Sequence, residues 1–367
     1  MNILLLSTHL NTGGITSYLL TLTEGLIRQG HKVYLATSAG ELLKRFQDTG
    51  AQHIQLDIKV KSELNPKVYS SLFILKRFIK DKKIDILNSQ TRVTQVLGQL
   101  LSPMTQVPYI ATCHGFYKVR FSRQWFPCWG DAVIAISKAV MNHLLNDFRT
   151  PSEKVFLIHN GLDVNKFKPV NDELKAQKRR EFHLAEEPLI GIIARLVGVK
   201  GHEVLIKAME AVVKKFPSTK LMIVGQGREE NNLRNLAQQL NLQNNILFIP
   251  VSNQTDEILP IFDIFVLPSL DEGLGISLME AQAVELPVIG SRIGGIVSLI
   301  EHGKTGLLVN PNDSKDLTEA IINLLENRLE AKRLGQQARI FISENFSAEQ
   351  MVQKTLQVYQ TVLASRQ

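Results

Sequence analysis

Short apolar runs alternate along most of the chain with longer segments in which apolar residues recur every three or four positions. The first pattern indicates buried β-strands, and the second indicates helices with one apolar face. In the first half of the chain, strands are predicted at residues 3–7, 32–37, 53–56, 84–88, 109–112, 132–136 and 155–158. Helices are predicted between them at residues 15–29, 41–49, 66–81, 94–101 and 138–146. Strands that alternate with helices predict a parallel sheet covered on both faces.

The segment 166–187 interrupts this alternation with Pro169 and many charged residues, and Pro188 follows it. Beyond it, strands are predicted at 189–194, 220–224, 246–249, 264–267, 288–289 and 307–309. Helices are predicted at 202–216, 229–240, 256–261, 276–284 and 313–326, and the tail 329–365 is almost entirely helical in pattern. We therefore predict an α/β chain of two Rossmann-like domains, with the junction after residue 165. Such sheets bind ligands at the carboxyl ends of their strands, near the point where the strand order reverses.

Composition and charge narrow the class of protein. With 367 residues the chain has room for two domains of ordinary size. A cytoplasmic location is favoured by three features of the sequence. It has only two cysteines, which lack metal-type spacing, it has no apolar run of membrane-spanning length, and it shows no basic N-terminal leader. The net charge of +7 is uneven, since residues 1–168 hold 21 Lys and Arg against 11 Asp and Glu. The basic first half predicts binding to an anionic surface or substrate, unless its helices are merely solvated. The sequence holds no nucleic-acid recognition motif, so we expect no nucleic-acid partner.

The stretch 271–306, D-E-G-L-G-I-S-L-M-E-A-Q-A-V-E-L-P-V-I-G-S-R-I-G-G-I-V-S-L-I-E-H-G-K-T-G, holds the densest candidate chemistry. A turn with Gly273 and Gly275 separates the strand 264–267 from the helix 276–284. Glu272 and Glu280 lie eight residues apart, so a helix could turn both carboxylates to one side. The free N–H groups at the helix start suit a phosphate. The alternative is a pair of solvated glutamates.

This stretch, with its flanking V-I-G-S-R-I-G-G-I and G-K-T-G-L-L-V, resembles the donor-site signature of the retaining GT-B glycosyltransferases of family 4, the glycogen-synthase-like and mannosyltransferase-like group. The resemblance implies a GT-B fold, with two Rossmann-like domains whose parallel sheets face a central cleft. It also implies that the last helix, about 348–367, returns to the first domain. Glu272 would accept hydrogen bonds from the sugar hydroxyls, and Glu280 from the ribose. The backbone of Gly273, Leu274, Gly275 and Ile276 would face the sugar and the phosphate.

Further motifs follow other strands. Arg195 and Lys200, five residues apart, can hold a diphosphate and stabilise the charge on the leaving group, although either could be an ordinary surface cation. By resemblance, Gly13 and Gly14 lie against the donor, and His114 lies near the anomeric carbon and the 6-position of the sugar. Gly225, Gly227 and Val251 line the nucleotide pocket in the same comparison. From the residues alone, the glycines could be plain turns and His114 a structural histidine.

An aromatic and basic segment, Phe116–Trp129, interrupts the first domain. Aromatic rings beside cations suit a membrane interface, a lipid-linked acceptor or stacking on sugars, and they equally suit helix packing with a solvated basic face. A second basic cluster comprises Lys76, Arg77, Lys80, Lys82 and Lys83. The first alternative would bring the protein into contact with an anionic membrane surface and place it on the inner face of the cell membrane, whereas the packing alternative implies a cytoplasmic location alone.

The resulting functional hypothesis is a retaining transfer of a sugar from a nucleotide-diphosphate donor, with UDP-sugars favoured, to a lipid-linked or cell-envelope glycan. His114, Arg195, Lys200 and Glu272 are the candidate catalytic residues. No D-x-D motif is present, so we expect no metal and no other cofactor. Two alternatives remain at the level of the sequence: a GT-B nucleotide-sugar 2-epimerase, and a non-catalytic nucleotide-sugar-binding partner subunit.

Overall fold

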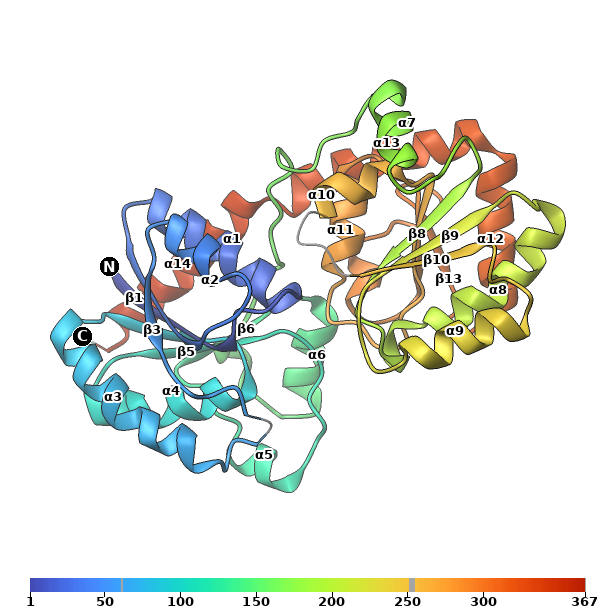
Figure 1. The fold of residues 1–367 in the computed structure, drawn as a ribbon. Helices are drawn as coiled ribbons and strands as arrows, with labels where there is room; N and C mark the ends of the chain where they lie inside the picture. The colour runs from blue at the N-terminus through green and yellow to red at the C-terminus, as the bar shows by residue number, and fades with distance from the viewer. Residues whose placement is uncertain (61, 251–254, 367) are drawn as a thin grey trace. The chain divides into compact units, whose positions relative to one another are not determined.

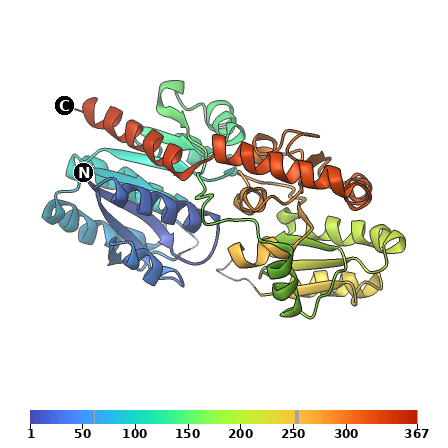
Figure 2. The same cartoon turned by 90° about the horizontal axis from the view of Figure 1, so that it is seen from above.

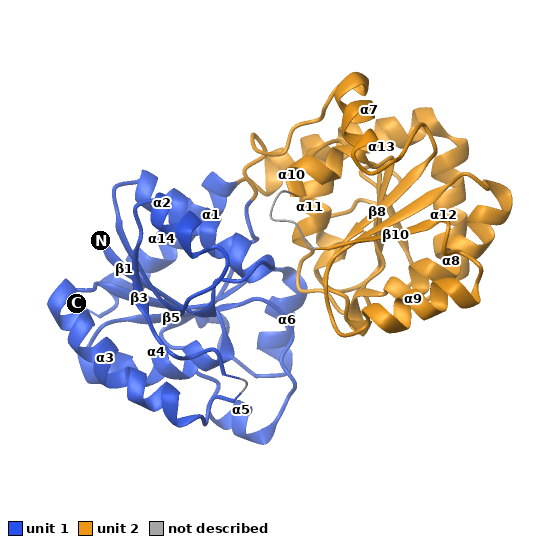
Figure 3. Ribbon diagram, viewed as in Figure 1, with its two compact units in different colours: residues 1–161, 348–367 blue, residues 162–347 orange. Residues whose placement is uncertain are grey.

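The computed structural model describes residues 1–60, 62–250 and 255–366, which form two compact units. The first unit comprises residues 1–161 together with 348–367, and the second comprises residues 162–347 (Figure 3). The boundary therefore falls after Gly161, slightly before the predicted junction. Each unit has its own sheet and its own hydrophobic core.

The first unit is built on a seven-stranded parallel sheet in the order β3-β2-β1-β4-β5-β6-β7. Its strands are β1 Asn2–His9, β2 Lys32–Ser38, β3 Gln52–Gln55, β4 Ile86–Ser89, β5 Tyr109–Cys113, β6 Ala132–Ala135 and β7 Val155–Leu157. Its helices are α1 Gly14–Arg28, α2 Leu43–Asp48, α3 Pro66–Lys82, α4 Arg92–Thr105, α5 Phe121–Trp125, α6 Lys138–Asn146 and the C-terminal α14 Ala348–Ala364. α1, α2 and α14 cover one face of the sheet, and α3 and α4 cover the other (Figure 1).

The sequence explains why these elements form where they do. Ile3 to Leu6 in β1 are fully buried, as expected for a strand with a helix layer on each face. Asn65 caps α3 by accepting from the backbone N–H of Lys67, and Pro66 occupies the first helical position, where its missing N–H costs nothing. The apolar runs and the capping residues therefore point to the same boundaries.

The second unit repeats the architecture with six parallel strands in the order β10-β9-β8-β11-β12-β13. Its strands are β8 Leu189–Ile193, β9 Lys220–Val224, β10 Ile246–Ile249, β11 Ile264–Leu267, β12 Val288–Ser291 and β13 Leu307–Val309. Its α-helices are α7 Asp172–Arg180, α8 His202–Lys215, α9 Glu230–Gln239, α10 Thr255–Ile258, α11 Ile276–Ala283, α12 Ser314–Glu326 and α13 Arg328–Asn345. α8, α9 and α12 lie along one side of the sheet in Figure 1. The two parallel sheets confirm the predicted α/β fold.

The helical tail divides between the two units. α13 ends at Asn345 and packs on α11 in the second unit. α14 belongs to the first unit, where it runs beside α1 (Figure 2) and contributes Met351, Val352 and Tyr359 to the core. A side chain at Gly25 of α1 would collide with Val352, so this glycine allows the two helices to approach closely. The break in the tail therefore lies where the resemblance placed the start of the returning helix.

Candidate active site

The strand order of the second sheet reverses between β8 and β11, which lie side by side. The loops that follow them leave the carboxyl ends of the strands, where such sheets bind their ligands. The β8 loop carries Arg195 and Lys200, and the β11 loop carries Glu272. Three residues predicted for the donor site therefore share one edge of this sheet.

Lys200 and Glu272 form an ion pair, in which Nζ of Lys200 lies 2.5 Å from Oε2 of Glu272. Oγ of Ser269 donates a hydrogen bond to the same carboxylate oxygen at 3.1 Å. The side chains are only 16% and 12% exposed, so solvent screens the pair weakly. The two predicted residues are thus mutual partners, and each fixes the position of the other.

Arg195 contrasts with Lys200. It is exposed, and its side chain makes no hydrogen bond or ion pair to any residue that the structure describes. A guanidinium carries several donors in a planar fork, which can grip a phosphate with two parallel hydrogen bonds. Lys200 already gives one donor to Glu272, whereas all the donors of Arg195 are available to an anion.

The glycines after β9 have a structural task that the sequence did not reveal. A Cβ at Gly225 would collide with the carbonyl of Ala194, and one at Gly227 would collide with the carbonyl of Leu196. In addition, the N–H of Leu196 donates to the carbonyl of Gln226 at 3.0 Å. These contacts hold the backbone on both sides of Arg195. Their predicted contact with a nucleotide stays a prediction.

Gly294 and Gly295 likewise pack closely on the backbone of the loop that carries Glu272. A Cβ at Gly294 would collide with the carbonyl of Glu272, and one at Gly295 with the carbonyl of Gly273. The N–H of Gly295 donates to the Glu272 carbonyl at 2.9 Å. The G-G pair in R-I-G-G-I was the available sequence signal for this close packing.

The start of α11, where phosphate binding was predicted, has a backbone conformation that favours glycine. Gly275 precedes the first helical residue, Ile276, and adopts a φ of 103°, a conformation that residues with a side chain rarely adopt. Among the residues that the structure describes, no side chain caps this helix start. Leu274 buries its side chain, being 2% exposed, so this segment can offer a ligand mainly its backbone.

Glu280 faces different surroundings from Glu272. It is 8% exposed on α11 and lies close to Thr255 and Lys166, with Asp256 nearby. Burial raises the pKa of Glu280 to about 7, although a hydrogen bond from Thr255 and the charge of Lys166 act to lower it. A carboxyl with this pKa changes charge close to neutral pH.

This pKa predicts a pH dependence of donor binding. If ribose hydroxyls donate to the Glu280 carboxylate, the donor binds the charged form, and its affinity should rise with pH up to about 7 and then level off. Below that pH the affinity should fall by up to about tenfold per unit. Calorimetric titration with UDP-glucose at several pH values tests this, because its diphosphate diester does not titrate in the range. The Glu280→Gln variant should give a flat profile, and an unchanged slope would contradict the assignment.

In the first unit, two predicted motifs lie next to each other. Gly13 precedes α1, which begins at Gly14, and a Cβ at Gly13 would meet no described atom within 4 Å. Tyr18 on α1 packs its ring edgewise against His114, with the ring centroids 4.8 Å apart. The Gly-Gly turn and His114 are therefore joined through one helix.

His114 follows β5 and is held by a residue that belongs to none of the sequence motifs. Its Nε2 lies 2.8 Å from Oε1 of Gln90, the buried residue that directly follows β4. Burial lowers the pKa of His114 to about 3, so the imidazole is neutral at physiological pH. β4 borders the point where the order of this sheet reverses, between β1 and β4, and a polar residue at that strand end was the missed signal.

The segment Phe116–Trp129 divides into a packed and an exposed part. Tyr117 and Trp129 pack together with ring centroids 5.9 Å apart, and Trp129 is 6% exposed. Phe121 and Trp125, on the unpredicted short helix α5, are 75% and 79% exposed. The packed rings agree with the helix-packing alternative, whereas contact of the exposed rings with a membrane or a lipid-linked acceptor stays a prediction.

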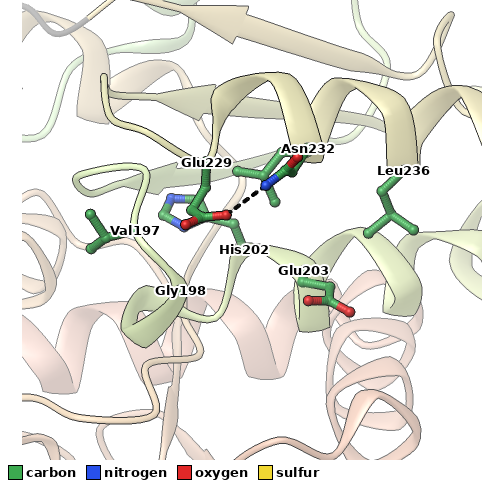
Figure 4. Close-up of a pocket in the computed structure, with 8 residues that line it drawn as sticks. Val197, Gly198, His202, Glu203, Glu229, Asn232 and Leu236 are labelled. Atoms are coloured by element: carbon green, nitrogen blue, oxygen red, sulfur yellow. Dashed lines mark hydrogen bonds between the residues drawn. The ribbon is translucent and has the colours of Figure 1, made fainter.

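A cavity of about 250 Å³ lies beside the loop that carries Arg195 (Figure 4). It is lined by Val197, Gly198, His202, Glu203, Glu229, Asn232, Leu233 and Leu236. The Asn232 amide donates to the Glu229 carboxylate at 2.9 Å, and burial lowers the pKa of His202 to about 4. None of the predicted donor residues lines this cavity, so it is not the predicted donor site.

Some predictions cannot be placed in the structure. Val251, predicted beside the base, lies outside the described residues.

Among the residues that are described, no three His, Cys, Asp or Glu side chains gather as metal ligands. Within the same residues, no helix has the length and apolar character needed to cross a membrane.

Both halves of the chain match models of known protein families. Residues 175–341 match the family model described as glycosyl transferases group 1, and residues 12–166 match that of glycosyltransferase family 4. The capsular polysaccharide biosynthesis glycosyltransferase CapM of Staphylococcus aureus is 26% identical over 93% of this chain and 92% of its own. The UDP-Gal:α-D-GlcNAc-diphosphoundecaprenol α-1,3-galactosyltransferase of Escherichia coli is 25% identical over 80% of this chain and 79% of its own.

The fold has matches among solved structures as well. Anabaena HepE, solved in complex with UDP-glucose, superposes with a TM-score of 0.88 at 20% sequence identity. The match covers 98% of this chain and all of HepE. A glycosyltransferase from Rickettsia africae gives the same TM-score at 24% identity, over 99% of this chain. These two likenesses concern the fold.

Proposed function

Because this chain belongs to the GT-B glycosyltransferases of family 4 and uses a nucleotide-sugar donor, we propose that it transfers the sugar with retention of the anomeric configuration. UDP-sugars are the favoured donors in this proposal, since the E. coli relative is named for UDP-Gal. The acceptor in this proposal is a lipid-linked or cell-envelope glycan, since CapM is named for capsular polysaccharide biosynthesis and the E. coli relative for a diphosphoundecaprenol-linked sugar. No metal takes part.

The proposed reaction breaks the bond between the anomeric carbon and the phosphate oxygen. The acceptor hydroxyl forms the new bond on the same face of the sugar, and its proton passes to the leaving phosphate oxygen. The products are a nucleoside diphosphate and the glycoside. Arg195 and Lys200 would stabilise the negative charge that develops on the diphosphate. Glu272 would orient the sugar through its hydroxyls rather than attack the anomeric carbon, so no covalent glycosyl-enzyme forms.

One observation carries this proposal: the partly buried Lys200–Glu272 pair at the point where the strand order of the second sheet reverses, with Arg195 exposed in the same loop. The carboxylate has a second oxygen, Oε1, that can accept hydroxyl donors. A cation and an acceptor fixed within one hydrogen bond of each other suit a ligand that carries a diphosphate next to a polyol.

The test combines a binding screen with product analysis. UDP-, GDP- and ADP-sugars are first compared by thermal shift, where the true donor raises the melting temperature by mass action. That donor is then incubated in EDTA with and without a polyprenyl-diphosphate-linked N-acetylglucosamine as the acceptor probe. We expect a glycoside with the anomeric configuration of the donor. Epimerisation of the donor alone would favour the 2-epimerase, and binding without any turnover would favour the partner subunit. Activity that requires added Mn²⁺ or Mg²⁺ would overturn the metal-free part.

The acceptor side of the proposal rests on a surface of the first unit that is both apolar and basic. Arg92 connects the segment before α3 with the segment after α5. The guanidinium of Arg92 lies 3.5 Å from Glu63, near the start of α3, and donates to the carbonyls of Phe126 and Pro127 after α5. The surface exposes Leu64, Phe73, Ile74, Phe121, Trp125 and Phe126, with the cations Lys76, Arg77, Lys118, Arg120 and Arg123 in the same segments. Exposed aromatic rings with cations suit an anionic membrane, so we place the enzyme on the cytoplasmic face of the cell membrane.

Loss of the two most exposed aromatic residues of α5 should weaken membrane binding. The double variant Phe121→Ser with Trp125→Ser should bind vesicles of phosphatidylglycerol at least about tenfold more weakly, since burying each ring is worth roughly 1.5–3 kcal/mol. Co-sedimentation measures this, with phosphatidylcholine vesicles as the neutral comparison. Leu329→Ser is the matched control, because Leu329 is 88% exposed but lies on α13 in the other unit. Equal binding of the double variant and the wild type would exclude this surface.

A further inference from the structure

A chain of buried amide groups runs from the main chain of β5 to His114. The side-chain amide of Asn88, in β4, donates from Nδ2 to the carbonyl of Ile110 at 3.2 Å and to Oγ1 of Thr112 at 3.1 Å. A main-chain carbonyl only accepts hydrogen bonds, so the nitrogen end of Asn88 must face it. This contact leaves Oδ1 of Asn88 as an acceptor in the interior of the sheet.

The next link is Gln90, which donates from Nε2 to that Oδ1 of Asn88. The orientation of Asn88 therefore fixes the orientation of Gln90, whose Oε1 points to Nε2 of His114 at 2.8 Å. Asn88, Gln90 and Thr112 have no exposed surface, so water does not compete for these contacts. An amide oxygen has no proton to give, and Nε2 of His114 must accordingly be the donor.

We propose that Gln90, oriented by Asn88, is a positioning residue that fixes His114 as the Nε2–H tautomer and presents its bare Nδ1 as a hydrogen-bond acceptor. Nδ1 makes no hydrogen bond to the residues that the structure describes, and the edge of Tyr18 packs on the same ring. The ring that carries Nδ1 is thus held on one side by an aromatic edge and on the other by an amide.

This assignment changes the expected chemistry of His114, and it rests on the proposed function for its consequence. From its motif, His114 is expected near the anomeric carbon and the 6-position of the sugar. A bare Nδ1 accepts from a hydroxyl but repels a carboxylate or a carbonyl oxygen, neither of which brings a proton. The site would therefore select a substrate that carries a hydroxyl at this position over its deoxy or acidic analogue.

The tautomer is measurable without turnover. In protein labelled with ¹⁵N-histidine, long-range ¹H–¹⁵N correlation spectra distinguish a protonated Nε2 from a protonated Nδ1, and His114→Gln assigns the signal. We expect the Nε2–H pattern for His114 in the wild type throughout pH 6–8. Gln90→Leu should give a mixture of tautomers, whereas Gln90→Glu, which keeps an acceptor in place, should retain Nε2–H. Gln95→Leu is the matched control, because Gln95 is an equally buried glutamine that bonds Tyr117 and Thr112 rather than His114.

Kinetic measurements distinguish a failure of the positioning role of Gln90 from a failure of the proposed function. Gln90→Leu should lower kcat about tenfold while the donor KM stays within about twofold, and Gln90→Glu should recover part of the loss. A wild-type spectrum with Nδ1–H, or a Gln90→Leu spectrum identical to the wild type, would overturn the positioning role. If the spectra behave as expected but no sugar is transferred, the positioning role stands and the proposed function fails. If Gln90→Leu does not fold, the wild-type and Gln90→Glu spectra still decide the tautomer.

Discussion

Replacing Lys200 with methionine should lower kcat for sugar transfer by about 10² to 10³, the loss seen when one preorganised group that stabilises transition-state charge is removed. Methionine keeps the length of the side chain, so the loss reports the charge. The ammonium group lies 2.5 Å from Glu272 in a partly buried place, where electrostatic interactions are stronger than in water. UDP release from the donor identified by thermal shift measures kcat, and calorimetry with UDP measures ground-state binding separately.

Two further variants make this prediction specific. Lys207→Met is the control, because Lys207 lies on α8 in the same unit, pairs with Glu203 and is half-exposed. It should stay within about twofold of the wild type. Lys200→Met combined with Glu272→Gln decides between two roles. If Lys200 serves only to neutralise Glu272, the double variant should regain the activity of Glu272→Gln alone. If Lys200 acts on the diphosphate, the two losses should accumulate.

The sequence predicted most of the fold, because a parallel sheet with helices on both faces needs strands that are apolar throughout. β9, β10, β11 and β13 match their predicted ranges residue for residue. α5 was missed because its five residues are shorter than the period needed to show an apolar face, and its two largest side chains face solvent. The prediction was therefore strongest where burial imposes a pattern.

The contacts within the candidate site could not be predicted in the same way. Lys200 and Glu272 are separated by 72 residues, and His114 and Gln90 by 24, so no local period links either pair. They meet because neighbouring parallel strands end at one edge of a sheet. The sequence named Lys200, Glu272 and His114 through their motifs, but it missed Gln90, which belongs to none of them. The packing tasks of Gly225 and Gly294 likewise depend on backbone from other loops.

A partly buried ionic cluster ties α7 to the core of the second unit. Arg179 is 6% exposed, and its guanidinium donates to Oδ2 of Asp263 at 2.7 Å and to the carbonyl of Ile261 at 2.9 Å. Lys175 donates to Oδ1 of Asp263 at 2.8 Å, and the N–H of Leu189 donates to Oδ2 at 2.8 Å. Burial alone would raise the pKa of Asp263, but Lys175 and Arg179 hold it below its usual value. The sequence suggested only a charged junction here.

Arg179→Ala should lower the free energy of unfolding of the second unit by about 1.5 to 3 kcal/mol, since it removes charge-assisted hydrogen bonds to Asp263, whose side chain is 35% exposed and keeps Lys175 as a partner. Arg180→Ala, at the exposed neighbouring position, should cost less than about 0.5 kcal/mol. Both tryptophans, Trp125 and Trp129, belong to the first unit, so tryptophan fluorescence follows that unit and circular dichroism follows both. In urea the dichroism transition of Arg179→Ala should move to lower concentration, away from the fluorescence transition.

The contribution of Asp263 to stability is present above its unfolded pKa of 3.8 and is lost as the pH falls through its lower folded pKa, so the cost of Arg179→Ala should shrink in acid. Coincident transitions at pH 7 in both variants would show that the cluster does not stabilise the second unit.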